Sequence, residues 1–256
     1  MAAMTVGSSS AARPGLLALV GGDEFKPGNE AQDRQLIEAA LAHGGPAYIV
    51  ATAAREHPDA AVATARGWFS GLGLEVSELR LRTRTEAGRA ATVGAAEGAS
   101  FVYLAGGDPG RVPQILADTP AWEAVLRAWR AGAVLAGSSA GAMALGSWTL
   151  IRARMPGDTS RTARAGLGVV PGIAVVPHFE TFGHRWLPSI RELAASEGVV
   201  LLGIDERSAA MWGDGTWRVE GPGSVTVIDA EGEWRHGAGE PIDGLPAPRV
   251  AGNVVG

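Results

Sequence analysis

The sequence has no cysteine and only one lysine among its 256 residues. Without cysteine the chain can form no disulfide, no thiolate metal site and no cysteine nucleophile. Its lysine, Lys26, stands beside Pro27 and Gly28 in a predicted loop. A Schiff base or a serine–lysine pair needs an amine deep within a site, so neither kind of catalysis is expected here.

Basic clusters and long apolar runs are also missing. The formal net charge is -5, and no block of consecutive basic residues could follow a phosphate backbone. No apolar run approaches the ~20 residues that cross a bilayer. Residues 1–15 have neither the basic start nor the apolar stretch of a secretory signal. We therefore expect no nucleic acid and no membrane as partners, and a cytoplasmic location.

Apolar residues, in contrast, are plentiful. They make up 46% of the chain, charged residues only 19%, and there are 37 glycines. A chain of this length and composition can bury one large core and needs many tight turns. We predict a disordered tail over residues 1–13 and a single domain over residues 14–256.

Short apolar runs alternate with segments of helical spacing in the first half of the chain. The segments 30–42 and 60–69 have apolar residues every three or four positions. This alternation predicts an α/β fold, with a doubly wound, mostly parallel sheet and helices on both faces. The predicted strands are 16–20, 47–51, 76–81, 101–105 and 133–136.

The second half has a different pattern. The polar segment 152–164 predicts a loop, and residues 185–196 have helical spacing. After residue 209 the apolar residues alternate between glycine turns, which predicts a C-terminal extension rich in β-hairpins. The strands predicted in this half are 173–177, 199–204, 217–219 and 224–228.

A serine stands between a predicted strand and a predicted helix. The run Gly137-Ser138-Ser139-Ala140-Gly141 follows strand residues 134–136 directly. Glycines two residues either side of Ser139 allow the sharp turn of a nucleophile elbow, after which the Ala140 amide can face an oxyanion. Ser139 is therefore the predicted nucleophile. The alternative is a glycine-bounded helix start capped by Ser138 or Ser139.

A serine nucleophile needs a base, and histidine is the usual one. His178 ends the predicted strand 173–177, and strand ends in an open α/β sheet meet where ligands bind. His178 is therefore the predicted base, with a packed structural histidine as the alternative. The five histidines are His43, His57, His178, His184 and His236.

Acidic and glycine residues follow other strands on the same side of the predicted sheet. Asp205 and Glu206 come directly after strand 199–204, and either could orient the imidazole or simply be solvated. Gly106 and Gly107 follow strand 101–105, where their amides could complete an oxyanion hole. The run Gly21-Gly22-Asp23-Glu24 after the first strand has the same form, with a simple tight turn as the alternative.

Four motifs together resemble a known family. They are Gly106-Gly107-Asp108, Gly137 to Ala142, His178-Phe179 and Gly203-Ile204-Asp205-Glu206. In order and spacing they are similar to the motifs of the S51 serine peptidases, which include peptidase E and cyanophycinase and have a sheet like that of class I glutamine amidotransferases. The resemblance extends over residues 16 to 230.

The resemblance implies a single catalytic domain that works by acyl transfer without a cofactor. Ser139 would attack, His178 would act as general base and then as acid, and Glu206 rather than Asp205 would orient it. The implied partner is a small peptide or amide substrate, with a homodimer left open.

The substrate positions depart from the cyanophycinase pattern. Pro109 stands where cyanophycinases have glutamine, and most of the basic positions after His178 hold other residues. These departures argue against cyanophycin itself. Peptidase E prefers an amino-terminal aspartate, for which a guanidinium is a suitable clamp. Asp108, Arg185 and Arg207 are the predicted substrate-binding residues, with surface arginines as the alternative.

Three other interpretations remain. Ser139, Asp205 and His236 follow the chain order of α/β-hydrolase esterases. A metal site of His178, Glu180 and His184 is disfavoured, because their spacing does not match a helical zinc pair. A catalytically inactive, amidotransferase-like module that binds a small acidic ligand is the third.

Overall fold

The computed structural model describes residues 13–152 and 161–249. Of the predicted tail, residues 1–12 lie outside this range. No helix in the described part of the chain is both long enough and apolar enough to span a membrane.

The first sheet has seven strands, in the order β11-β10-β1-β5-β4-β2-β3. The five strands from β1 to β3 are parallel, β10 is antiparallel to β1, and β11 is antiparallel to β10. This arrangement confirms the predicted, mostly parallel sheet. Its strands are β1 (Leu17–Val20), β2 (Ala47–Val50), β3 (Val76–Glu78), β4 (Phe101–Leu104), β5 (Val134–Ser138), β10 (Ala209–Gly213) and β11 (Thr216–Glu220).

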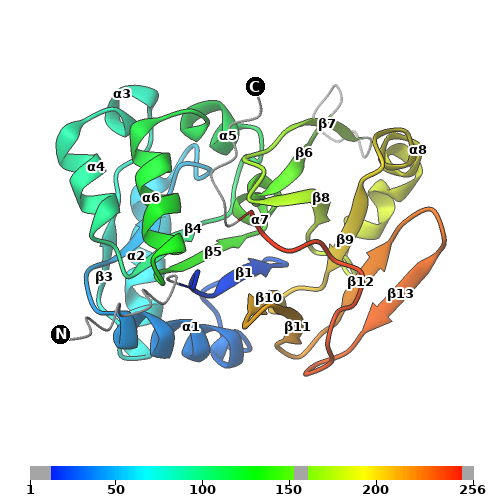
Figure 1. Cartoon of the computed structure of the whole chain (residues 1–256), viewed down its shortest axis with the longest axis horizontal. Helices are drawn as coiled ribbons and strands as arrows, with labels where there is room; N and C mark the ends of the chain where they lie inside the picture. The colour runs from blue at the N-terminus through cyan, green and yellow to red at the C-terminus, as the bar shows by residue number, and fades with distance from the viewer. Residues whose placement is uncertain (1–12, 153–160, 250–256) are drawn as a thin grey trace, which may run out of the picture.

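Helices cover both faces of this sheet, as the strand–helix alternation predicts (Figure 1). Successive strand residues point to opposite faces. Accordingly, Leu17 and Leu19 of β1 join one apolar core, and Ala18 and Val20 join the other. The core that contains Ala18 and Val20 also includes buried residues of α1 (Glu30–His43) and α2 (Pro58–Gly71). The core that contains Leu17 and Leu19 includes buried residues of α3 (Arg84–Ala87), α4 (Ala90–Glu97), α5 (Arg111–Leu116), α6 (Pro120–Arg130) and α7 (Ala140–Leu145).

A second, mixed sheet of six strands lies beside the first, in the order β13-β12-β9-β8-β6-β7. Strands β6, β8 and β9 are parallel, and the other three are antiparallel to their neighbours. The prediction of a separate C-terminal hairpin extension is therefore wrong, because the β10–β11 hairpin belongs to the first sheet and the β12–β13 hairpin belongs to the second. The strands are β6 (Gly146–Arg152), β7 (Arg161–Ala165), β8 (Val170–Val176), β9 (Val200–Ile204), β12 (Val225–Ile228) and β13 (Glu233–His236).

Strand β7 also corrects the predicted loop over 152–164. Its residues are mostly polar, which suggested irregular structure, but β7 pairs with β6 alone and lies at the edge of the sheet. An edge strand faces solvent and tolerates arginine and threonine. The segment 153–160 lies outside the described residues.

The two sheets meet at the turn that follows β1. The His178 N–H, just after β8, donates to the Gly21 carbonyl at 2.7 Å, and the Arg207 N–H, after β9, donates to the Gly22 carbonyl at 2.9 Å. A 3₁₀ turn (Gly183–Trp186) then leads into α8 (Leu187–Glu197), which begins two residues later than predicted. The ends of β1, β5, β8 and β9 are thereby brought to one place.

Candidate active site

Ser139 occupies a strained turn between β5 and α7. Its backbone has φ 48° and ψ -110°, a conformation that non-glycine residues rarely adopt. A Cβ on Gly137 would lie 2.6 Å from the Gly141 carbonyl carbon, and one on Gly141 would lie 2.2 Å from the Leu104 carbonyl oxygen. Both flanking glycines are therefore required by close packing, which agrees with a nucleophile elbow.

His178 stands opposite this serine. Its Nε2 atom lies 3.1 Å from the Ser139 hydroxyl. The histidine backbone is itself in the left-handed region, with φ 52°, and its N–H is held by Gly21. The Phe182 ring stacks on the imidazole, with centroids 4.7 Å apart and an interplanar angle of 19°. Backbone and ring contacts together fix the direction of the imidazole.

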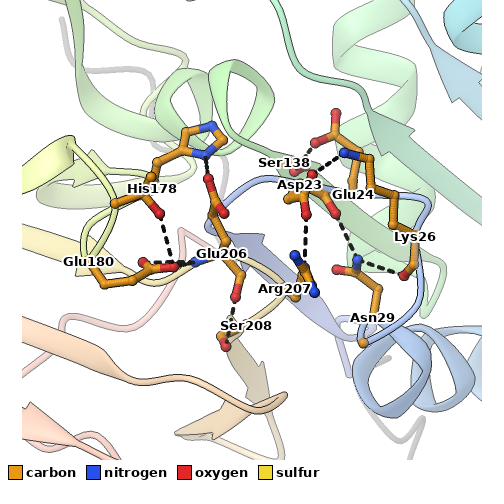
Figure 2. Close-up of polar contacts among 12 residues, drawn as sticks. Asp23, Glu24, Lys26, Asn29, Ser138, His178, Glu180, Glu206, Arg207 and Ser208 are labelled. Atoms are coloured by element: carbon orange, nitrogen blue, oxygen red, sulfur yellow. Dashed lines mark hydrogen bonds and ion pairs between the residues drawn. The ribbon is translucent and has the colours of Figure 1, made fainter.

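Glu206 is the carboxylate that contacts this histidine. Its Oε1 atom lies 2.7 Å from His178 Nδ1, so the side chain spans from the end of β9 to the imidazole (Figure 2). The Glu206 backbone N–H donates to both oxygens of Glu180, at 3.0 and 3.1 Å. The glutamate is thus held at its backbone as well as at its side chain.

Asp205, the other acid that the sequence left open, is directed elsewhere. Its Oδ2 accepts the Ser224 N–H at 3.0 Å and lies 3.4 Å from Arg235 Nη2. Burial, together with the neighbouring Glu180 carboxyl, raises the pKa of Asp205. The geometry therefore brings Glu206, and not Asp205, to His178.

This chain of contacts suits one tautomer of His178. With Nδ1–H donating to the Glu206 carboxylate, Nε2 of a neutral His178 carries the lone pair that faces Ser139. A lone pair at hydrogen-bond distance from a hydroxyl can accept its proton as the oxygen attacks. The arrangement is therefore competent to activate Ser139.

The predicted oxyanion donors are not equivalent. Ala140 is the first residue of α7, where helix amides lack an intrahelical acceptor. Gly107 lines the cleft beside Ser139 with φ 141°. The Gly106 N–H, however, donates to Glu24 Oε1 at 2.8 Å. Gly106 is therefore already engaged, and Ala140 and Gly107 are the amides that remain for an oxyanion.

A cleft of about 760 Å³ opens over Ser139 and His178, and Asp108 is among the described residues that line it. Arg185 and Arg207 are not among the described residues that line it. Arg207 donates instead to Asp23 Oδ2 at 2.8 Å (Figure 2). Arg185 lies in the 3₁₀ turn before α8. The structure therefore does not bring these two arginines to the cleft.

Other arginines, which the sequence analysis did not select, take their place. The described residues that line the cleft include Arg55, Arg111, Arg152, Arg161 and Arg164. Three of them lie at or near the ends of the predicted loop over 152–164. Their density in the sequence was a signal, but only the folded structure, in which Arg152, Arg161 and Arg164 line the same cleft as Ser139, shows where they lie.

The residues of the other interpretations do not converge. His236 lies in β13, opposite Val225 in the second sheet, while His178 holds the position next to Ser139. His184 Nδ1 bonds the Phe179 carbonyl at 2.8 Å. Within the described part of the chain, no three histidine, aspartate or glutamate side chains form a group that could hold a metal ion.

A serine on an elbow, a histidine at 3.1 Å and a carboxylate behind that histidine are the arrangement of the serine hydrolases, here on an α/β fold. Residues 16–219 match the model of peptidase family S51. The chain belongs to peptidase family S51, the serine peptidase family that its motifs resemble, and is a hydrolase of that family.

Two proteins similar in sequence to this chain are cyanophycinases. The chain is 29% identical to a cyanophycinase of Synechococcus elongatus over 84% of its own length and 68% of the relative. It is 34% identical to a cyanophycinase of Nostoc sp. over 73% of its length and 63% of the relative.

Two solved structures are also similar. A peptidase from an acI-B1 Actinobacterium has a TM-score of 0.79 at 28% identity, covering 91% of this chain and 98% of that one. A putative peptidase E of Listeria monocytogenes has a TM-score of 0.50 at 16% identity, covering 88% and 98%, and shares the fold.

Proposed function

We propose that this protein hydrolyses a small peptide or isopeptide bond of the aspartyl type through an acyl-enzyme on Ser139. The observation that carries the proposal is the chain of contacts from Ser139 through His178 to Glu206, at 3.1 and 2.7 Å. These are the distances at which a serine, a base and an orienting acid act as one unit.

In the acylation half, Ser139 Oγ attacks the scissile carbonyl carbon while its proton passes to His178 Nε2. The carbonyl oxygen becomes an oxyanion between the Ala140 and Gly107 amides. His178 then gives the proton to the leaving nitrogen, the C–N bond breaks, and the amine departs.

In the deacylation half, a water molecule takes the place of the amine. His178 removes one water proton, the hydroxide oxygen attacks the acyl carbon, and the proton returns to Ser139 Oγ as the acid is released. Glu206 stabilises the imidazolium that forms twice in the cycle, and its bond to Nδ1 keeps Nε2 directed at the reaction.

The aspartyl part of the proposal rests on two supports. The motifs resemble peptidase E, which prefers an amino-terminal aspartate, and relatives named cyanophycinase share 29–34% of their aligned residues with this chain. The arginines of the cleft are suited to a substrate carboxylate, because guanidinium and carboxylate form paired hydrogen bonds.

The proposal is tested by a fluorophosphonate probe together with a library of aspartyl dipeptides and isoaspartyl amides. We expect Ser139 to be labelled and the library to be cleaved. Ser139→Ala and His178→Ala should lose both, whereas His236→Ala should keep both. Labelling that survives His178→Ala but not His236→Ala would support the esterase interpretation. Neither labelling nor cleavage by the wild-type protein would support a binding module.

A further inference from the structure

The charge of the cleft is opposite to that of the whole chain. The chain carries a formal charge of -5. In contrast, the described residues that line the cleft include five arginines and a single carboxylate, that of Asp108. A concave site with one sign of charge concentrates ligands of the opposite sign and raises their association rate by about 10–10³-fold.

Three of these arginines have contacts within the protein. Arg111 donates to the carbonyls of Thr52 at 2.9 Å and Arg82 at 3.2 Å. The Arg161 guanidinium lies 4.0 Å above the Trp186 ring. Arg55 Nη1 lies 3.8 Å from the Asp108 carboxylate, so the single acid of the lining is largely balanced by one arginine.

Arg164 differs from these three arginines in its surroundings. It lies opposite Thr149 in the antiparallel β6–β7 pair, and residues directly opposite each other share a face of the sheet. The Thr149 hydroxyl donates to the Pro109 carbonyl at 3.2 Å, so this face is turned toward the loop of Gly107 and Asp108. Arg164 is exposed and has no acidic partner among the described residues.

We propose that the cleft selects substrates in which the residue next to the scissile aspartyl unit is acidic, and that Arg164 contacts its carboxylate. This inference rests on the proposed function and specifies its substrate class. A carboxylate gains a charge-assisted hydrogen bond there, whereas a lysine or arginine side chain meets charges of its own sign.

Three matched dipeptides test this selectivity: isoaspartyl-glutamate, isoaspartyl-glutamine and isoaspartyl-lysine. We expect kcat/KM to fall in that order by about tenfold or more from first to last, and the ratio to shrink as salt is added. Arg164→Gln should reduce the glutamate-to-lysine ratio about threefold or more. Arg89→Gln removes the same charge from an exposed position outside the cleft lining and should leave the ratio unchanged.

A second experiment separates this inference from the proposed function. It measures by calorimetry how tightly the same dipeptides bind to the Ser139→Ala variant. Tighter binding of the glutamate dipeptide without turnover by the wild-type protein would overturn the proposed bond class and leave the selectivity standing. Equal or reversed affinities, or no binding of any of the three, would overturn the selectivity.

A second inference comes from an independent set of contacts, those of Glu24. This residue follows β1 in the turn that begins at Gly21. Its Oε1 atom accepts the Gly106 N–H at 2.8 Å. Its Oε2 atom accepts the Ser138 hydroxyl, also at 2.8 Å (Figure 2). One carboxylate therefore joins two segments far apart in the sequence.

Both segments adjoin the reacting atoms. Gly106 immediately precedes Gly107, and Ser138 immediately precedes the nucleophile. The packing around Gly106 is close, since a Cβ there would lie 2.8 Å from Glu24 Oε1 and 3.4 Å from Ser139 Cβ. Movement of the carboxylate would therefore alter the distance between the nucleophile and the oxyanion donors.

We infer that Glu24 is a positioning residue, which holds the Gly107 amide and Ser139 at their working separation. Misplacing an oxyanion donor affects the transition state more than the bound substrate, so its loss should lower kcat and leave KM nearly unchanged. We assign this role to the two hydrogen bonds and not to the negative charge. Glutamine should therefore replace Glu24, because its side-chain oxygen can accept from the Gly106 N–H and its amide nitrogen can donate to Ser138 Oγ.

The test compares Glu24→Ala, Glu24→Gln and a matched control, Glu30→Ala. Glu30 also accepts a backbone N–H, that of Gly28, in the same loop at 2.6 Å. We expect Glu24→Ala to lower kcat about 10–100-fold with KM within about twofold. Glu24→Gln should recover kcat to within about threefold of wild type, and Glu30→Ala should change kcat by less than about threefold.

Three results would overturn this inference: an unchanged kcat in Glu24→Ala, a loss in which KM rises as much as kcat falls, or a Glu24→Gln variant as slow as Glu24→Ala. Thermal melting of each variant accompanies the kinetics. A folded Glu24→Ala protein with normal KM and low kcat is the outcome that general destabilisation does not produce. If Glu24→Ala fails to fold, Ser138→Ala removes one of the two bonds and should lower kcat in the same selective way.

Discussion

Gly22 makes room for the imidazole of His178. A Cβ atom built on Gly22 would lie 2.3 Å from His178 Cε1 and 2.5 Å from Nε2, and the backbone there has φ 111°. Any side chain at this position would displace the predicted base. The sequence left the run at Gly21-Gly22 as either a ligand-facing glycine turn or a simple tight turn, and the structure places the second glycine against the imidazole.

Gly22→Ala should therefore lower kcat/KM by about two orders of magnitude or more, since displacement by even 1 Å can cost ~10²-fold. Dipeptide hydrolysis and circular dichroism measure the effect on activity and on fold. Gly28→Ala is the control, because Gly28 has a similar φ of 103° but its Cβ would meet only the flexible Arg207 side chain, with Cδ nearest at 2.9 Å. Equal losses in the two variants would contradict a specific contact with His178.

Glu206 and Asp205 should respond differently to the loss of their charge. Glu206→Gln removes the carboxylate that contacts His178 Nδ1, and changes of this kind lower kcat by up to ~10⁴-fold. Asp205→Asn alters contacts to Ser224 and Arg235 and should change kcat by less than about threefold. The measurement is kcat for both variants on one substrate. A larger loss in Asp205→Asn would reassign the orienting acid.

Gly107 offers a test of the oxyanion donors. A Cβ there would lie 2.2 Å from the Ala53 carbonyl oxygen, so Gly107→Ala must shift the loop that carries this amide. We expect kcat to fall about 10²–10³-fold, the usual cost of losing one donor. In the same loop, a Cβ on Gly110 would meet only side chains, Ile151 Cγ2 at 3.1 Å and Asp108 Oδ1 at 3.6 Å, so Gly110→Ala should remain active. Normal kcat in Gly107→Ala would exclude this amide as a donor.

Asp33 should make stability depend on pH. Burial raises the pKa of this α1 carboxyl from 3.8 to about 7, although the Trp68 indole donates to its Oδ2 at 2.7 Å. Its Oδ1 has no partner among the described residues. The folded state therefore retains a proton that the unfolded state releases near pH 4. The free energy of unfolding should fall as the pH rises from about 4 to about 7, and then level off.

Asp33→Asn removes this dependence and keeps an acceptor for Trp68. Its unfolding free energy, relative to wild type, should rise between pH 4 and pH 8 by up to about 4 kcal/mol, since one pKa unit corresponds to ~1.36 kcal/mol. Urea unfolding at several pH values measures the difference. Asp214→Asn, at a side chain that is 95% exposed, should show no such rise. A flat difference for Asp33→Asn would contradict the raised pKa.

Much of the first sheet and the centre of the site could be predicted from the sequence. Buried parallel strands are continuous apolar runs, so the bounds of β1, β2 and β4 are predicted to within one residue and those of β5 to within two. The chemistry of Ser139 and His178 follows from their positions at strand ends, because a strand end limits where a side chain can point.

The second sheet and the arginines of the cleft could not be predicted in the same way. Strands β8 and β9 have the apolar pattern of a parallel sheet, but the pattern does not say which sheet they join. An edge strand such as β7 has no apolar face long enough to recognise. The role of Glu24 depends on hydrogen bonds to residues about 80 and 115 positions away, which no local pattern records.

The chain passes repeatedly between the two sheets. After α7 it builds β6 to β9 in the second sheet, returns to the first for β10 and β11, and goes back to the second for β12 and β13. Three crossings of the chain and the His178–Gly21 and Arg207–Gly22 backbone hydrogen bonds therefore join the two sheets. The described part of the molecule should therefore unfold in one cooperative transition, and its two sheets should not melt as separate units.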